Sequence, residues 1–92
     1  MSLIKEEHLS KELEKLDGWI YENRSITKTY SFTTYMDSIS FINRLAVEAE
    51  KNNHHPDMVV GWCKVVVAFT SHEKGGVTKE CVIMAKRSDS VY

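Results

Sequence analysis

The spacing of apolar residues switches repeatedly between two periods, and this switching constrains the fold more than any other feature of the sequence. Leu9, Leu13 and Leu16 recur at the spacing of one helix face, and charged residues occupy the other faces. Residues 26–32 instead alternate small hydroxyl side chains with larger ones, which is typical of a β-strand. Helices and strands must therefore share one small core.

A second, longer helix is expected after Thr34. The hydroxyl of Thr34 and the carboxylate of Asp37 three residues later fit a capping box. Apolar residues keep helical spacing from there as far as Ala49. Because Pro56 disfavours helical geometry at the residue before it, this helix should end near residues 52–53.

Two further strands and a third helix complete the pattern. Gly61 separates two β-rich segments, Gly75 and Gly76 form a tight turn, and Thr78 can cap a helix that runs to about Arg87. The order is helix, strand, strand, helix, strand, strand, helix over residues 5–16, 19–22, 26–32, 34–53, 58–60, 64–70 and 78–87. Strands adjacent in sequence usually pair. We therefore expect one α+β domain over residues 1–92, a four-stranded antiparallel sheet with helices packed on one face.

Charge and composition exclude several classes of function. The 12 Lys and Arg residues nearly balance 13 Asp and Glu residues, so there is no electrostatic footprint for direct nucleic-acid binding. The longest apolar run, residues 65–69, is far shorter than the roughly 20 residues of a membrane span. The polar, acidic start predicts no secretory signal, and Cys63 and Cys81 form no CxxC pair. A reduced, cytoplasmic setting follows, although pairing of the two cysteines stays open.

Histidine is concentrated in one part of the chain, since three of the four histidines fall between positions 54 and 72. His54 and His55 follow the long helix, where the helix carbonyls favour a protonated imidazole. His72 ends the Val-rich strand and approaches this corner if residues 58–60 and 64–70 form a bent strand or a hairpin. Three imidazoles beside one cleft would form a proton-transfer site.

Other readings of these residues compete with that one. Adjacent histidines at a helix end are commonly solvated caps. Three histidines with Asp57 could also hold zinc, although neighbouring side chains diverge and lack the i, i+4 geometry of a helical metal site. His8 lies on the charged side of a helix and is read as a surface residue. Trp19 and Trp62 are either core residues or an aromatic wall for a flat heterocycle.

The spacing of the histidines matches a known pattern. Three residues separate the acidic residue Glu50 from His54-His55-Pro56, Trp62 is the sixth residue after the proline, and nine residues separate Trp62 from His72. With Gly18-Trp19 and Gly75-Gly76-Val77-Thr78 on either side, the chain resembles the pterin-4a-carbinolamine dehydratase family over nearly its whole length. The fold of that family agrees with the α+β order derived above.

The resemblance implies an enzyme that dehydrates 4a-hydroxytetrahydropterin to quinonoid dihydropterin, recycling the tetrahydrobiopterin of aromatic amino-acid hydroxylases, with no metal or organic cofactor. It implies that His54, His55 and His72 are catalytic. It also implies pterin contacts from a second set of residues, namely Asn53, Thr70, Ser71, Trp19 and Glu50. Loss of the hydroxyl needs a proton on the leaving oxygen and removal of one from a ring nitrogen. Our hypothesis is that His55 or His72 delivers the first and His54 takes the second.

Three departures from the family pattern bear on this reading. Cys81 stands where the family usually has an aspartate, Met58 replaces a frequent tryptophan, and Ser88 and Asp89 fall where the last helix is usually apolar. Cys81 slightly favours an alternative, a non-catalytic dimerisation or assembly module of the coactivator type. The intact histidines favour the enzyme more. The family also implies a homodimer or homotetramer, which an open sheet edge permits.

Overall fold

Alternating side chains build the sheet, and the helices cover the side that carries the apolar residues. The computed structural model describes residues 2–92. Its helices and strands are α1 (Glu6–Glu14), β1 (Ile20–Glu22), β2 (Ser25–Ser31), α2 (Tyr35–Asn52), β3 (Asp57–Val60), β4 (Lys64–Phe69) and α3 (Lys79–Val91). This is the predicted order, and the four strands form one antiparallel sheet in the order β1-β2-β4-β3. The α+β prediction is confirmed.

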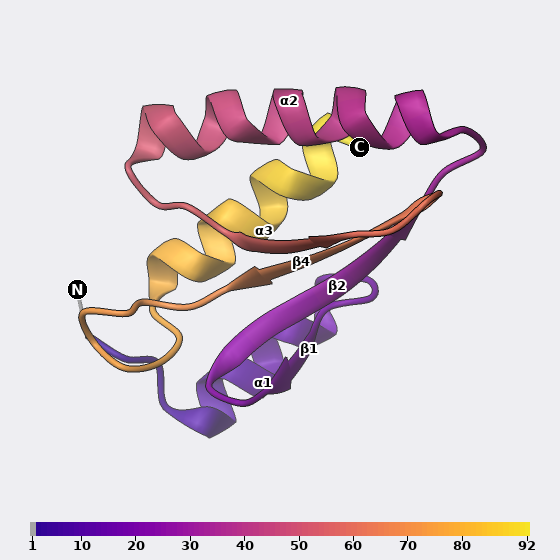
Figure 1. Ribbon diagram of the computed structural model, residues 1–92. Helices are drawn as coiled ribbons and strands as arrows, with labels where there is room; N and C mark the ends of the chain where they lie inside the picture. Colours follow the sequence, from indigo (N-terminus) through magenta and orange to yellow (C-terminus); the bar gives the residue numbers. More distant parts are fainter. Residues whose placement is uncertain (1) are drawn as a thin grey trace.

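The buried face of the sheet follows from the two-residue period of its strands. In the register of β2 with β4, Ile26 pairs with Phe69 and Tyr30 with Val65, and all four side chains are buried. They form one cluster with residues from all three helices, among them Leu9, Leu45 and Ala85. Figure 1 shows α2 and α3 side by side over the sheet. The helices thus cover one face, as predicted.

The second helix begins and ends where the sequence indicates. The Thr34 hydroxyl accepts a hydrogen bond from the backbone N–H of Asp37 at 3.0 Å, as expected of its predicted cap. Phe41, Leu45 and Ala49 are buried at intervals of four residues and face the sheet. Asn53 takes the left-handed conformation, φ 48°, and ends the helix.

Two details differ from the sequence prediction. The hydroxyl of Thr78 makes no capping bond to α3 but lies 3.7 Å from the Cys81 sulfur. The helix also runs on to Val91 rather than stopping near Arg87. The helix can continue because the polar residues of its last turns form hydrogen bonds inside the fold. One of these bonds joins the Ser88 and Tyr30 hydroxyls, 2.9 Å apart.

Asp89 is the centre of a partly buried polar cluster. Its carboxylate accepts hydrogen bonds from Trp19 Nε1 at 3.1 Å, from Lys28 Nζ at 2.9 Å and from the Tyr30 hydroxyl. Burial and the hydrogen bond to Asp89 both raise the pKa of Tyr30 well above its ordinary value, so the phenol stays protonated and donates. These bonds tie the start of β1, the middle of β2 and the end of α3 together.

Replacing Asp89 should therefore destabilise the fold. Asp89→Ala leaves the Trp19 N–H and the Lys28 ammonium without their acceptor, and hydrogen bonds to charged groups carry more stability than neutral ones. We expect the free energy of unfolding to fall by about 2 kcal/mol, measured by urea denaturation. Lys86→Ala, at an exposed position of the same helix, is the matched control and should change it little. Equal stability of the two variants would contradict the role assigned to the cluster.

Candidate active site

The topology brings the end of α2 next to the loop that follows β4. His54 and His55 come directly after α2, and β3 pairs with β4, so the chain beyond Phe69 runs back toward them. A hollow of about 230 Å³ lies between these segments. It is lined by Asn53, His54, His55, Thr70, Ser71, His72 and Glu73. The three histidines named from the sequence therefore share one hollow, together with Asn53, Thr70 and Ser71.

His54 is the inner imidazole of the three, with only 12% of its side chain exposed. Its ring stacks on Phe69, with the ring centroids 6.0 Å apart. Nε2 lies 3.3 Å from the buried Cys81 sulfur, and Nδ1 lies 3.8 Å from Oε2 of the more exposed Glu80. Burial lowers the pKa of His54 below its ordinary value, while the charge of Glu80 acts in the opposite direction. At neutral pH this imidazole is therefore a neutral base.

His55 and His72 are exposed, and each has a carboxylate beside it. His55 Nε2 is bonded to the carboxylate of Glu50, five residues earlier on α2. His72 Nε2 lies 3.5 Å from Oδ2 of Asp57, the first residue of β3. A carboxylate can only accept, so it orients each ring with an N–H toward the acid. The hollow thus combines one mostly buried imidazole with two that are exposed to solvent.

A tight turn holds His72 at the edge of the hollow. The N–H groups of Gly75 and Gly76 both donate to the Ser71 carbonyl, at 2.7 and 3.2 Å, and Gly75 has a positive φ of 75° that favours glycine. The Thr70 hydroxyl donates to the Arg24 carbonyl at 2.7 Å. Because its only hydrogen is used there, Thr70 can offer the hollow an acceptor.

Other residues named from the sequence lie elsewhere. Trp19 is buried in the core, with its N–H on Asp89, and its ring packs against Phe69 rather than lining the hollow. Trp62 is 82% exposed in the turn between β3 and β4, so the reading of Trp62 as a core residue is wrong. Sequence reasoning missed the contacts of His54 with Phe69 and with Glu80. In the sequence, only Cys81, which departs from the family pattern, drew attention to the surroundings of His54.

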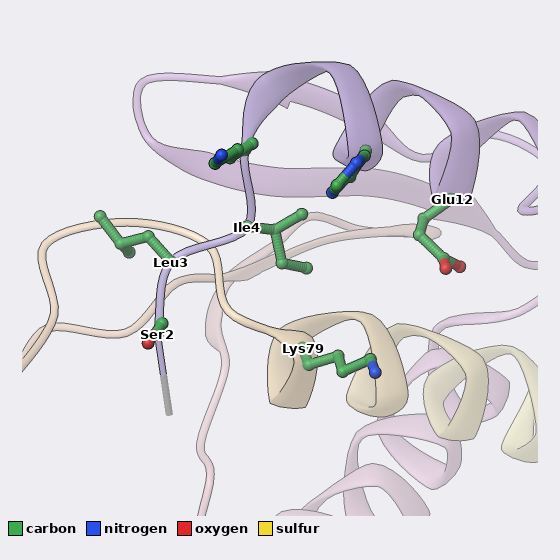
Figure 2. A pocket seen from close by; sticks show the side chains of 7 residues that line it. Ser2, Leu3, Ile4, Glu12 and Lys79 are labelled. Atoms are coloured by element: carbon green, nitrogen blue, oxygen red, sulfur yellow. The ribbon is translucent and has the colours of Figure 1, made fainter.

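A larger hollow lies on another part of the molecule. It has a volume of about 530 Å³ and is bounded by the N-terminal segment, α1 and the start of α3, with residues Ser2, Leu3, Ile4, Lys5, His8, Glu12 and Lys79 along it. Figure 2 shows Ile4, Glu12 and Lys79 around this space. His8 is the one histidine among the residues that line it, and the rim carries apolar side chains together with a few separate charged ones. It gathers no set of proton-transfer groups, so the smaller hollow is the candidate active site.

Neither a metal-binding cluster nor a membrane-spanning helix is found among residues 2–92. No group of three or more His, Cys, Asp or Glu side chains in this range is arranged to hold a metal ion. Within the same range, no helix combines the length and the apolar character needed to cross a membrane.

The family model of pterin 4 alpha carbinolamine dehydratase matches residues 2–91. The chain belongs to this family. A Sulfurisphaera tokodaii protein, provisionally named a pterin-4-alpha-carbinolamine dehydratase, is 34% identical over 91 residues and covers 99% of this chain and 98% of its own. The family resemblance stated from the histidine spacing is thereby confirmed.

Solved structures of pterin dehydratases and related proteins share the fold. A transcriptional coactivator/pterin dehydratase from Brucella melitensis superposes with a TM-score of 0.92 at 27% identity, over 98% of both chains. A pterin dehydratase-like protein identified as a RuBisCO assembly factor in the alpha-carboxysome shares only the fold, with a TM-score of 0.66 at 19% identity. That match covers 79% of this chain and 84% of the other.

The burial of His54 predicts how stability depends on pH. The unfolded chain takes up a proton at His54 near pH 6.5, and the folded chain takes it up only at a lower pH. The free energy of unfolding should therefore fall as the pH drops below about 6.5. In His54→Gln this contribution is absent, so urea denaturation between pH 7.5 and 5 should show a shallower loss than in the wild type. Equal losses in the two proteins would contradict a depressed pKa.

Proposed function

We propose that this chain dehydrates a 4a-hydroxytetrahydropterin to quinonoid dihydropterin and water by histidine general acid/base catalysis. The observation that carries the proposal is the sharing of one hollow by a buried imidazole, His54, and two exposed ones, His55 and His72. Membership of the pterin 4 alpha carbinolamine dehydratase family supplies the substrate class.

The two environments suit the two proton transfers of the reaction. The leaving hydroxyl takes one proton and departs as water, and a ring nitrogen gives up another as the carbon–nitrogen double bond forms. His54, neutral and stacked on Phe69, is the base for the ring proton. His55 or His72, each an N–H donor beside a carboxylate, is the acid for the hydroxyl. Solvent then restores both protonation states, so no net proton is consumed.

The rim of the hollow supplies polar groups for the edge of a pterin. The Asn53 amide offers both a donor and an acceptor, and the hydroxyls of Thr70 and Ser71 offer acceptors. Glu50 acts through His55, which it orients. We assign Trp19 no stacking contact with the ring, because it is buried in the core and its N–H is bound to Asp89.

Removing the histidines should abolish most of the rate. We expect His54→Ala and His72→Ala each to lower kcat for quinonoid dihydropterin formation by about 100-fold, the lower end of general acid/base contributions. The measurement uses purified protein and a chemically prepared 4a-carbinolamine, with the spontaneous reaction subtracted. His8→Ala, an exposed histidine beside the other hollow, should keep the wild-type rate.

Two results would reject parts of this assignment. A wild-type rate no higher than the spontaneous reaction rejects the enzyme. A clear wild-type rate that survives in both His54→Ala and His72→Ala rejects the site while keeping the activity.

We further propose that the reaction serves tetrahydrobiopterin recycling in the cytoplasm. Support comes from the cysteines, since Cys63 and Cys81 are both free thiols and Cys81 lies fully buried beside His54. Free thiols are typical of reducing compartments.

A second candidate function is a non-catalytic assembly module. It is favoured by exposed apolar side chains along β3 and the turn after it, where Val59 is 69% and Trp62 82% exposed. Of the two structural neighbours, one is named a transcriptional coactivator/pterin dehydratase and the other was identified as a RuBisCO assembly factor. The dehydratase assay decides between the two functions, because a module without catalysis gives only the spontaneous rate.

The open edge of the sheet also predicts self-association. Among residues 2–92, β3 is an edge strand whose one strand partner is β4, and an unpaired edge can add to a second copy across a two-fold axis. We expect light scattering to give the mass of a homodimer or homotetramer of the 10.6 kDa chain. A mass of one chain at every concentration tested would contradict this.

A further inference from the structure

Two consecutive residues at the start of α3 flank the two nitrogens of His54. Cys81 places its sulfur 3.3 Å from Nε2, and Glu80 places Oε2 3.8 Å from Nδ1. Cys81 is fully buried, whereas about half of the Glu80 side chain is exposed. One ring nitrogen therefore faces the core and a neutral thiol, and the other faces outward, toward a charge.

The contacts of the thiol allow a chain of hydrogen bonds in which Nε2 of His54 carries the proton. A thiol has one hydrogen to donate and a sulfur that accepts weakly. Thr78 Oγ1 lies 3.7 Å from the Cys81 sulfur and can take the thiol hydrogen, which leaves the sulfur as acceptor for Nε2–H of His54. In a neutral imidazole, a proton on Nε2 leaves the lone pair on Nδ1. That is the nitrogen that does not face the core.

Glu80 acts on the other form of the ring. At 3.8 Å its carboxylate is too far from Nδ1 for a hydrogen bond while the ring is neutral. Once Nδ1 has taken a proton, the negative charge stabilises the imidazolium that burial disfavours. The other titratable groups that act on this ring are His55 and His72, whose positive charges oppose its protonation.

We propose that Cys81 and Glu80 are positioning residues for His54: the thiol holds the ring with its proton on Nε2, and the carboxylate stabilises the proton that Nδ1 accepts. Neither residue need touch the substrate. The proposal rests on the proposed dehydratase only for the direction of the proton transfer, because the state of the ring is a property of the free protein.

The first test is the tautomer of His54 in the wild type. The ¹⁵N chemical shifts of the ring, measured well above pH 7, should show Nε2 protonated and Nδ1 bare. A ring protonated on Nδ1 would overturn the proposal. In Cys81→Ala the two tautomers should become mixed, and Cys81→Ser, which keeps an acceptor in place, should restore the Nε2–H form. An unchanged tautomer in Cys81→Ala would also count against the role of the thiol.

The second test separates Glu80 from any exposed carboxylate. Glu80→Gln should lower the pKa of His54, because it removes the one nearby charge that favours the protonated ring. Glu14→Gln removes an exposed carboxylate from α1 and should leave the His54 titration in place. Equal shifts in the two variants would overturn the role of Glu80.

Activity provides an independent readout of the same residues. Cys81→Ala should lower kcat by about tenfold with little change in KM, a loss smaller than that of removing the base itself. Glu80→Gln should move the acidic limb of the pH–rate profile to lower pH together with the His54 titration. If the wild type has no dehydratase activity but its ring carries the proton on Nε2 and titrates as described, the positioning role stands and the proposed function fails.

Discussion

The left-handed turn at Asn53 determines the placement of the two adjacent histidines of the candidate site. After α2 the Asn53 backbone takes a φ of 48°, and the His54 N–H bonds back to the Ala49 carbonyl at 3.1 Å. This bond directs the His54 side chain toward Phe69 and the core. The next side chain, His55, points the other way and meets Glu50. Two adjacent residues of the same type thus come to differ in burial and in partner.

This divergence suits the opposite roles that we propose for identical side chains. A general acid and a general base need different proton affinities at one pH. The chain supplies the difference through the surroundings of each ring, because His54 is desolvated while His55 and His72 stay in water beside carboxylates.

The elements set by local sequence were predicted well. The Thr34 cap and the apolar spacing of α2 lie within the helix itself, and the alternation of β2 and β4 identified the buried side of the sheet. The length of α3 was underestimated because the partners of Ser88 and Asp89 lie about 60 residues away in β2. No local pattern could reveal that these polar residues bind a tyrosine and a lysine inside the fold.

The candidate site was predicted only in part for the same reason, because local sequence patterns do not reveal contacts between distant residues. The parity of His72 along β4 and the helix-end position of His54 were sufficient to bring the histidines to one corner. The pterin contact expected of Trp19 came from the family resemblance alone, which does not show that the ring N–H binds Asp89, a residue outside the family pattern. Of the two readings of Trp62, core residue or aromatic wall, the first is wrong because Trp62 lies exposed in the turn that connects β3 and β4.

The departure at Cys81 has a geometric consequence that helical periodicity explains. Consecutive residues on a helix project about 100° apart, so Glu80 cannot occupy the place of a carboxylate at position 81. However, the His54 ring lies across the first turn of α3, with Nε2 on the inner side beside Cys81 and Nδ1 on the outer side beside Glu80. The roughly 100° between these two consecutive residues thus places one beside each ring nitrogen. A carboxylate at position 81 would be buried and would bind the proton on Nε2 strongly. In this chain the charge of Glu80 acts from the solvent side on Nδ1, and because the Glu80 side chain is half exposed it raises the proton affinity of His54 less than a buried carboxylate would.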